Sequence, residues 1–201
     1  RLQDRRMNIK SLTISASLLL LAGCGTNSKK AEQFQALPFP DVLPPAMVDN
    51  PVAMTEYMAL HWWDGITDIS RSYPCDTLLV SGVRVGDIEQ KMANWTNLLG
   101  VVDMSVVEKS MGRLYERAAA CEKKDTSSNV FETFVGLVDK YLYDPNSPLR
   151  NEDHYAFFAS KLAGSDLVEQ VMKEKYAHQV RLAALNKVGT KAADFRFADA
   201  R

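Results

Sequence analysis

Cysteine has the most distinctive chemistry in this sequence, and the first of its three cysteines has the most informative neighbours. Cys24 follows the apolar run Leu18–Leu21 and the small residues Ala22 and Gly23, with basic Lys10 ahead of them. A bacterial lipoprotein signal has this layout: a peptidase cleaves after the small residues, and the next cysteine carries acyl groups such as palmitate. The run is shorter than the roughly 20 apolar residues that span a bilayer. We therefore predict cleavage between Gly23 and Cys24 and a lipid on Cys24.

The other two cysteines, Cys75 and Cys121, leave two interpretations open. They could form a disulfide in an oxidising envelope, or they could be two separate thiols, because spacing does not show that their Cα atoms lie within ~6 Å. The sequence has no Cys-x-x-Cys pair. A redox thiol gains its low pKa at a helix start or beside a positive charge, and Cys121 is expected near a helix end.

An aromatic cluster also invites a functional interpretation. Trp62 and Trp63 stand between His61 and Asp64, and Tyr73 follows shortly after. Trp62, Trp63 and Tyr73 are therefore candidate contacts for a peptide or glycan ligand. Two adjacent indoles at a helix end more often close a core and bond through their N–H groups, and we favour that interpretation.

The polar residues predict neither a metal site nor a catalytic site. Of the three histidines, His61, His154 and His178, only His154 adjoins carboxylates, Glu152 and Asp153. Adjacent side chains on a helix point apart, so they do not form a metal site. No phosphate-binding loop or nucleophile elbow occurs. The net charge of -1 offers no basic excess for nucleic acid, so we expect no cofactor and no nucleic-acid partner.

Three segments position these residues. Residues 1–23 comprise a short stretch ahead of Met7 and the lipoprotein signal; a secretory signal cleaved nearby and an accidental apolar run are the alternatives. Residues 24–50 are a proline-rich tether, since its prolines interrupt any helix. Residues 51–189 are a helical domain, for which we expect an all-α fold, a compact bundle of about five or six amphipathic helices.

The start of this domain carries the clearest signals. A helix is predicted over Val52–Trp63, with Asn50 as N-cap and Pro51 at the first helical position. Residues 64–86 are predicted to be mainly loop, because the two short apolar runs that flank Ser81-Gly82 would make only a marginal hairpin.

Apolar residues at helical spacing then form three stripes. The stripes are Ile88, Met92, Trp95 and Leu99; Val107, Met111, Leu114, Ala118 and Cys121; and Phe131, Phe134 and Val138. Further helix starts are predicted at Ser105, Asn129, Ser147 and either Ser165 or Asp166, and helix ends at Gly164, in a left-handed conformation, and at Gly189.

Three stretches together resemble one protein family. They are residues 61–64 with Asp68, the run Tyr141–Glu152, and the run Lys187–Phe195. From Pro38 to the end, the chain is similar to a helical N-terminal domain of unknown function, of the DUF5106 kind. That domain occurs in Bacteroidota lipoproteins that continue into a thioredoxin-like domain of the TlpA and peroxiredoxin kinds.

The resemblance implies a partner in the same polypeptide. Residues 190–201 are similar to the first strand of the thioredoxin-like domain, whose paired redox cysteines would lie beyond Arg201. No catalytic residue of the family can therefore be assigned in this sequence, and we expect no enzyme activity from it. In the resembling group, acidic residues after the anchor accompany surface export, so basic Lys29 and Lys30 favour the periplasmic side.

Two functions are consistent with these observations. The favoured one is a non-catalytic domain in the bacterial cell envelope, held at a membrane through acyl groups on Cys24, that positions or presents a thioredoxin-like thiol-disulfide oxidoreductase domain. The alternative is a stand-alone module that binds a peptide or glycan through its aromatic cluster.

Overall fold

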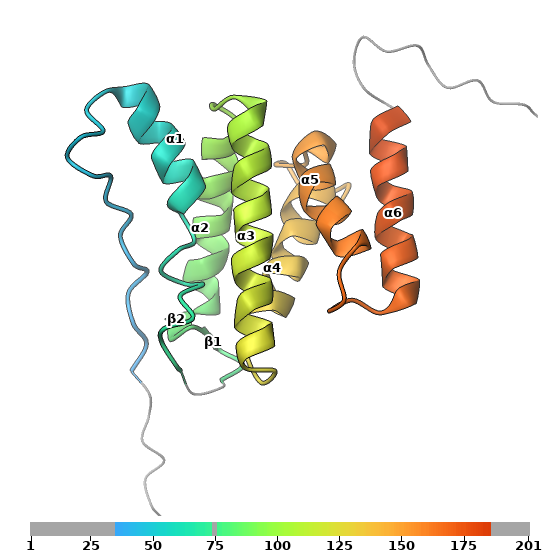
Figure 1. Cartoon of the computed structure of the whole chain (residues 1–201), viewed down its shortest axis with the longest axis horizontal. Coiled ribbons are helices and arrows are strands. Elements are labelled where there is room, and N and C mark those ends of the chain that lie inside the picture. Colours follow the sequence, from blue (N-terminus) through green and yellow to red (C-terminus); the bar gives the residue numbers. More distant parts are fainter. Residues whose placement is uncertain (1–34, 74–75, 186–201) are drawn as a thin grey trace, which may run out of the picture. The chain divides into compact units, whose positions relative to one another are not determined.

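The computed structural model describes residues 35–73 and 76–185. Within these ranges the chain forms six α-helices, one π-helical turn and one β-hairpin (Figure 1). In order these are α1 (Pro51–His61), β1 (Leu79–Val80), β2 (Val83–Arg84), α2 (Val85–Leu99), α3 (Met104–Lys124), α4 (Val130–Val138), η1 (Asp139–Tyr143), α5 (Glu152–Ala163) and α6 (Gln170–Leu185). The predicted all-α bundle is confirmed.

Helix α3 is the centre of the bundle, because it contacts α1, α4 and α5, and α5 in turn contacts α6. Successive helices run in opposite directions in Figure 1. The start of α1, the turn between α2 and α3, and the end of α6 therefore lie at one end of the bundle, which is the upper end in the figure. The hairpin and the first described residue, Gln35, lie at the other end.

The three predicted apolar stripes form the core. Every residue of the α2 stripe is fully buried, and the stripes of α3 and α4 are buried too. Burying a large apolar side chain contributes about 1.5–3 kcal/mol. The alternation of stripe and polar face in the sequence therefore identified the core correctly.

Helix α1 begins as predicted. Asn50 Oδ1 accepts a hydrogen bond from the Ala53 amide at 2.8 Å, and Pro51 stands in the first turn, where its missing amide costs nothing. The helix ends at His61 rather than Trp63, because the Asp64 amide donates to the His61 carbonyl at 3.1 Å in a tight turn.

The described part of the segment after α1 is mainly loop, as predicted, and it contains one short hairpin. Strands β1 and β2 pair in antiparallel fashion, and Val80 lies opposite Val83. Ser81 and Gly82 both have positive φ, 48° and 79°, as the tight turn of a two-residue hairpin requires. The hairpin persists because Val80 and Val83 are buried in the core, 0 % and 1 % exposed, so it is not an isolated ribbon in water.

The described part of the tether, residues 35–50, lies against this hairpin and the loop after α1. The Leu37 amide donates to the Gly82 carbonyl at 2.8 Å, and Leu37 bridges Val83 in parallel fashion. Pro40 packs so closely on Gly65 that a Cβ there would lie 2.6 Å from the Pro40 Cβ. Only glycine fits this contact.

Several predicted helix boundaries are wrong. Helix α3 begins at Met104 with Asp103 as N-cap, so Ser105 already lies inside the first turn. Asn129 does precede α4, but its side chain does not cap the helix; its Nδ2 instead donates to the Leu79 carbonyl of β1 at 2.7 Å.

The last two helices begin later than predicted. Ser147 does not cap α5; its hydroxyl donates to the Tyr141 carbonyl at 2.6 Å, and Asn151 accepts from the His154 amide at 3.1 Å as the true cap. Gly164 has a φ of -100°, so the predicted left-handed end is wrong. Helix α6 starts at Gln170 after a turn that includes Ser165, and its predicted end at Gly189 lies outside the described residues.

Candidate functional site

The predicted aromatic cluster divides between the core and the surface. Trp63 is 3 % exposed, and its ring makes edge contacts with Phe39, Trp95 and Phe134 at centroid distances of 5.7, 5.8 and 4.8 Å. These contacts make Trp63 a core residue that joins the tether, α2 and α4. The structural interpretation of this indole is therefore the one the geometry supports.

Trp62 and Tyr73 are only half-buried and lie at different places. The Trp62 ring lies 6.1 Å from the Phe39 ring. Tyr73 instead lies beside the Gly82 turn, and its hydroxyl accepts from Arg71 at 3.5 Å. Within the described ranges the indole N–H groups of Trp62 and Trp63 have no hydrogen-bond partner, although we expected both to bond.

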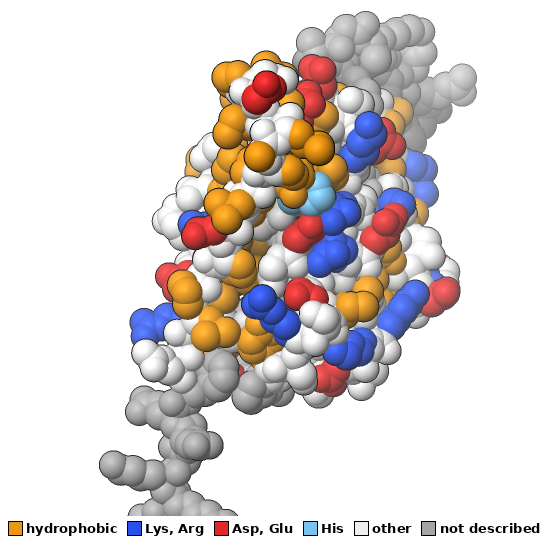
Figure 2. Space-filling model, turned by 60° about the vertical axis from the view of Figure 1, so that its left-hand side comes forward, with side chains coloured by type: hydrophobic (Ala, Val, Ile, Leu, Met, Phe, Trp, Pro, Cys, Tyr) orange, Lys and Arg blue, Asp and Glu red, His pale blue; other side chains and the backbone are white. Residues whose placement is uncertain are grey.

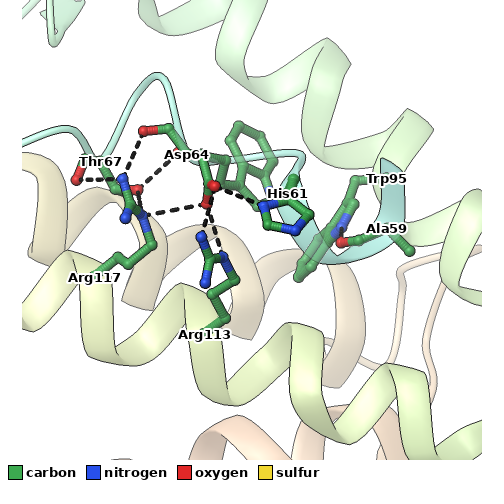
Figure 3. A network of polar contacts seen from close by, with 8 residues as sticks. Ala59, His61, Asp64, Thr67, Trp95, Arg113 and Arg117 are labelled. Carbon is green, nitrogen blue, oxygen red and sulfur yellow. Dashed lines mark hydrogen bonds and ion pairs between the residues drawn. The ribbon is translucent and has the colours of Figure 1, made fainter. Parts of the chain in front are cut away.

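The strongest polar constellation forms where the chain leaves α1 and meets α3 (Figure 3). Asp64 receives two hydrogen bonds from Arg113, one from Nε at 2.9 Å and one from Nη2 at 2.6 Å. Nδ1 of His61 lies 2.8 Å from Asp64 Oδ2, and the His61 ring stacks on Tyr57 at 4.1 Å. A fork-shaped guanidinium matched to a carboxylate is the strongest common form of ion pair.

A second arginine, one helical turn further along α3, completes this network. Arg117 donates from Nε to the Thr67 hydroxyl at 2.8 Å and from Nη2 to the Asp64 carbonyl at 2.8 Å. The Thr67 hydroxyl in turn donates to the Trp63 carbonyl at 2.7 Å. Arg117 thus provides donors for backbone carbonyls of the loop after α1, while Arg113 holds the carboxylate of the same loop.

The electrostatics of this network do not suit proton transfer. Burial alone would raise the pKa of Asp64, but hydrogen bonds from Arg113 and His61 outweigh it and hold that pKa below its usual range. The Asp64 carboxylate therefore stays ionised and fully engaged at neutral pH. The network holds the loop after α1 on α3.

Sequence reasoning missed the partners of this network. His61 and Asp64 had been singled out, whereas Arg113 and Arg117 had not. Their signal was present: two arginines four residues apart, beside the apolar stripe of one helix, place two guanidiniums at the edge of a packed face.

A second polar cluster joins η1, α5 and α6. The buried Tyr155 hydroxyl lies 2.9 Å from Asp139 Oδ1 and 2.9 Å from the side-chain oxygen of Gln179. One phenolic proton serves one acceptor, so with the Gln179 amide turned its NH₂ donates to the phenol while the phenol donates to Asp139. Burial raises the pKa of Tyr155 strongly, and it also raises the pKa of Asp139 in spite of Lys175 at 3.7 Å.

A small cavity lies beside the remaining described cysteine. It measures about 70 Å³ and is lined in part by Tyr73, Ser81, Cys121 and Asn129. Burial raises the pKa of the Cys121 thiol, which keeps the thiol protonated and weakly nucleophilic. Cys75 lies outside the described residues, so the predicted disulfide between these cysteines stays a prediction.

A family model described as a domain of unknown function, DUF5106, matches residues 23–186. The chain belongs to this family. No protein with a curated description matches the sequence.

A solved structure extends the comparison for this DUF5106 domain. The chain is similar to a thioredoxin-like protein from Bacteroides caccae, known from a crystal structure, with 28 % sequence identity and a TM-score of 0.60. The match covers 79 % of this chain and 51 % of that protein, so the chain spans about half the length of the protein it matches.

The DUF5106 domain shows no metal centre in its described part. Within residues 35–73 and 76–185, no group of three or more His, Cys, Asp and Glu side chains could hold a metal ion. His154 is buried, which lowers its pKa, and its Nδ1 has no partner among the described residues.

Across those same ranges, no helix is both long and apolar enough to cross a membrane. The predicted lipidation site Cys24 and cleavage site Gly23 lie outside them.

Proposed function

We propose that this DUF5106 domain is a non-catalytic, lipid-anchored helical domain that positions or presents a thioredoxin-like thiol-disulfide oxidoreductase domain in the bacterial cell envelope. The observation that carries the proposal is the likeness to a thioredoxin-like protein of which the chain spans about half. A helical domain that spans about half of such a protein leaves the other half for the thioredoxin-like domain.

The non-catalytic part of the proposal is supported by how the polar side chains are used. The best-formed carboxylate, Asp64, is held by Arg113 and His61, and the buried phenol of Tyr155 is held between Asp139 and Gln179. These hydrogen bonds use both groups to join elements of the fold.

The anchor is supported by sequence alone. The run Leu18–Gly23 followed by Cys24 has the layout of a lipoprotein signal. Lipid on Cys24 would hold the domain at a membrane, and basic Lys29 and Lys30 favour the periplasmic side.

Two measurements test these parts separately. The reading frame beyond Arg201 is expected to encode a thioredoxin-like domain; its absence contradicts the positioning role. Intact mass after expression in a bacterial host is expected to show a chain that begins at Cys24 and carries acyl groups. A Cys24→Ala variant is the control, and a wild-type chain that retains Met7 without acyl groups contradicts the anchor.

A third measurement tests the absence of catalysis. The 201-residue chain is expected to give only background rates in a thiol-disulfide exchange assay. The protein extended through its thioredoxin-like domain is expected to catalyse the exchange. Turnover by the chain itself that is lost in Cys75→Ser or Cys121→Ser contradicts the proposal.

The alternative of a stand-alone peptide- or glycan-binding module has less support. Its central indole, Trp63, is packed in the core, and Trp62 and Tyr73 contact different neighbours. Three rings that bind one ligand need to converge on one cavity.

A further inference from the structure

One end of the bundle carries an unusual concentration of exposed apolar side chains. This apolar end consists of Leu43, Met47, Val52, Val101 and Met104, which are 79, 87, 67, 74 and 47 % exposed. They belong to the segment before α1, to the first turn of α1, to the turn between α2 and α3, and to the start of α3. Figure 2 shows hydrophobic side chains gathered at the top of the molecule, over α1 and the segment before it.

Contacts between the helices place Val52, Val101 and Met104 at about the same level of the bundle. The Trp95 Nε1 of α2 donates to the Ala59 carbonyl of α1 at 2.8 Å, and Arg113 of α3 bonds Asp64 just beyond α1. Moving about two turns from each contact leads to Val52 on α1, to Val101 after α2 and to Met104 on α3. Apolar side chains gathered in this way on a folded surface mark an interaction site rather than chance exposure.

The path of the chain indicates what covers this surface. Helix α6 ends at Leu185 at the same end of the bundle, whereas the first described residue, Gln35, lies at the opposite end (Figure 1). A domain that follows α6 would thus emerge beside the apolar end. A short connection also gives the following domain an effective concentration of about millimolar, which a second copy from solution does not reach.

We infer that the apolar end is the docking surface for the thioredoxin-like domain, an inference that rests on the proposed function. Exposed Val52 and Val101 pack against an apolar face of that domain. The contact fixes its orientation away from the end where the tether enters. The domain is therefore held as a rigid body rather than on a free linker.

Hydrogen exchange tests this surface in the protein extended through its thioredoxin-like domain, with the 201-residue chain as reference. We expect amide exchange in residues 43–54 and 100–104 to be about tenfold slower in the extended protein. The double substitution Val52→Asp with Val101→Asp is expected to abolish this protection. The matched control, Leu78→Asp with Val171→Asp, changes two equally exposed apolar residues, 73 and 75 % exposed, elsewhere on the bundle and is expected to preserve it.

The outcomes separate the surface from the function. A gene without a thioredoxin-like frame overturns the proposed function and the surface together. An extended protein in which the apolar end exchanges at the reference rate overturns the surface alone, as does protection that the control substitutions remove. Protection that grows with protein concentration identifies a second copy as the occupant and overturns the choice of partner. Thermal melting of each variant confirms that it is folded.

Discussion

Arg113 holds Asp64 by two hydrogen bonds, so a residue in the middle of α3 fixes the loop that leaves α1. The carboxylate and the guanidinium are each about one-third exposed, 31 and 34 %. Solvent therefore weakens the pair relative to a buried one. The geometry nevertheless joins segments 49 residues apart in the chain, which is the kind of contact that defines a tertiary fold.

Arg113→Ala is expected to lower the free energy of unfolding by about 1–2 kcal/mol, because it leaves Asp64 half-buried with a weakened set of donors. Arg113→Lys should recover little, since an ammonium does not reproduce the two-pronged contact. Chemical denaturation measures both. The matched control is Lys161→Ala, whose pair with Glu116 at 3.2 Å is more exposed and should cost under about 0.5 kcal/mol. Equal losses in the two alanine variants would refute a special role for Arg113.

Acid is expected to act on Asp64 and Asp139 with opposite signs. The folded pKa of Asp64 lies below its ordinary value of 3.8, so its contribution to stability is complete above that pH and is lost as pH falls through the folded pKa. The pKa of Asp139 is raised, so the folded state favours its protonated form, and stability from this group increases as pH falls towards 3.8.

Asp64→Asn and Asp139→Asn separate these two effects in denaturation curves between neutral pH and about pH 3. Relative to wild type, Asp64→Asn should be most destabilised at neutral pH, with the gap closing in acid. The gap for Asp139→Asn should instead move in favour of wild type as pH falls. Parallel curves for wild type and both variants would contradict the assigned shifts.

Trp63→Ala is expected to cost about 3–5 kcal/mol, because it removes a ring packed against three aromatic neighbours. Trp62→Ala should cost much less, since that indole is only half-buried. Tryptophan fluorescence during chemical denaturation measures both. A small loss at Trp63, combined with loss of a bound glycan or peptide, would instead favour the binding-module alternative.

Intact mass measures whether Cys75 and Cys121 are paired. Cys121 is a buried free thiol, and Cys75 lies outside the described residues, so a disulfide and two separate thiols remain the two interpretations. Intact mass of periplasmic material with Cys24→Ala, alkylated after unfolding with and without reductant, distinguishes them: a disulfide gives no added label unless reductant comes first. Two labels without reductant would show that both thiols are free.

The sequence was most informative where one local signal dominated. The apolar stripes of α2, α3 and α4 predicted the core because burial follows periodicity directly. Asn50 and Pro51 predicted the start of α1 because a capping side chain directly precedes a proline that suits the first turn. Two capping residues, Asp103 and Ser105, stand close together before α3, and the pattern did not show which of them precedes the helix.

The long-range features had weaker sequence signals. The two short strands predicted only a marginal hairpin. Its stability comes from Val80 and Val83, which are buried in a core made by other segments, and the local sequence does not show this burial. The arginine partners of Asp64 lie on α3, roughly fifty positions away, and no local rule pairs residues at that separation. The five-residue π turn η1, with its bond from the Asp144 amide to the Asp139 carbonyl at 2.9 Å, likewise lay within an otherwise ordinary helical pattern.

The parallel bridge between Leu37 and Val83 has a mechanical consequence. A pull on the polypeptide ahead of Gln35 reaches the bond between the Leu37 amide and the Gly82 carbonyl before it reaches α1. The wedge of Pro40 on Gly65 comes next along the chain. A pulling force thus acts first on the hairpin and on the loop after α1, and α1 keeps its contacts with the bundle until these are broken.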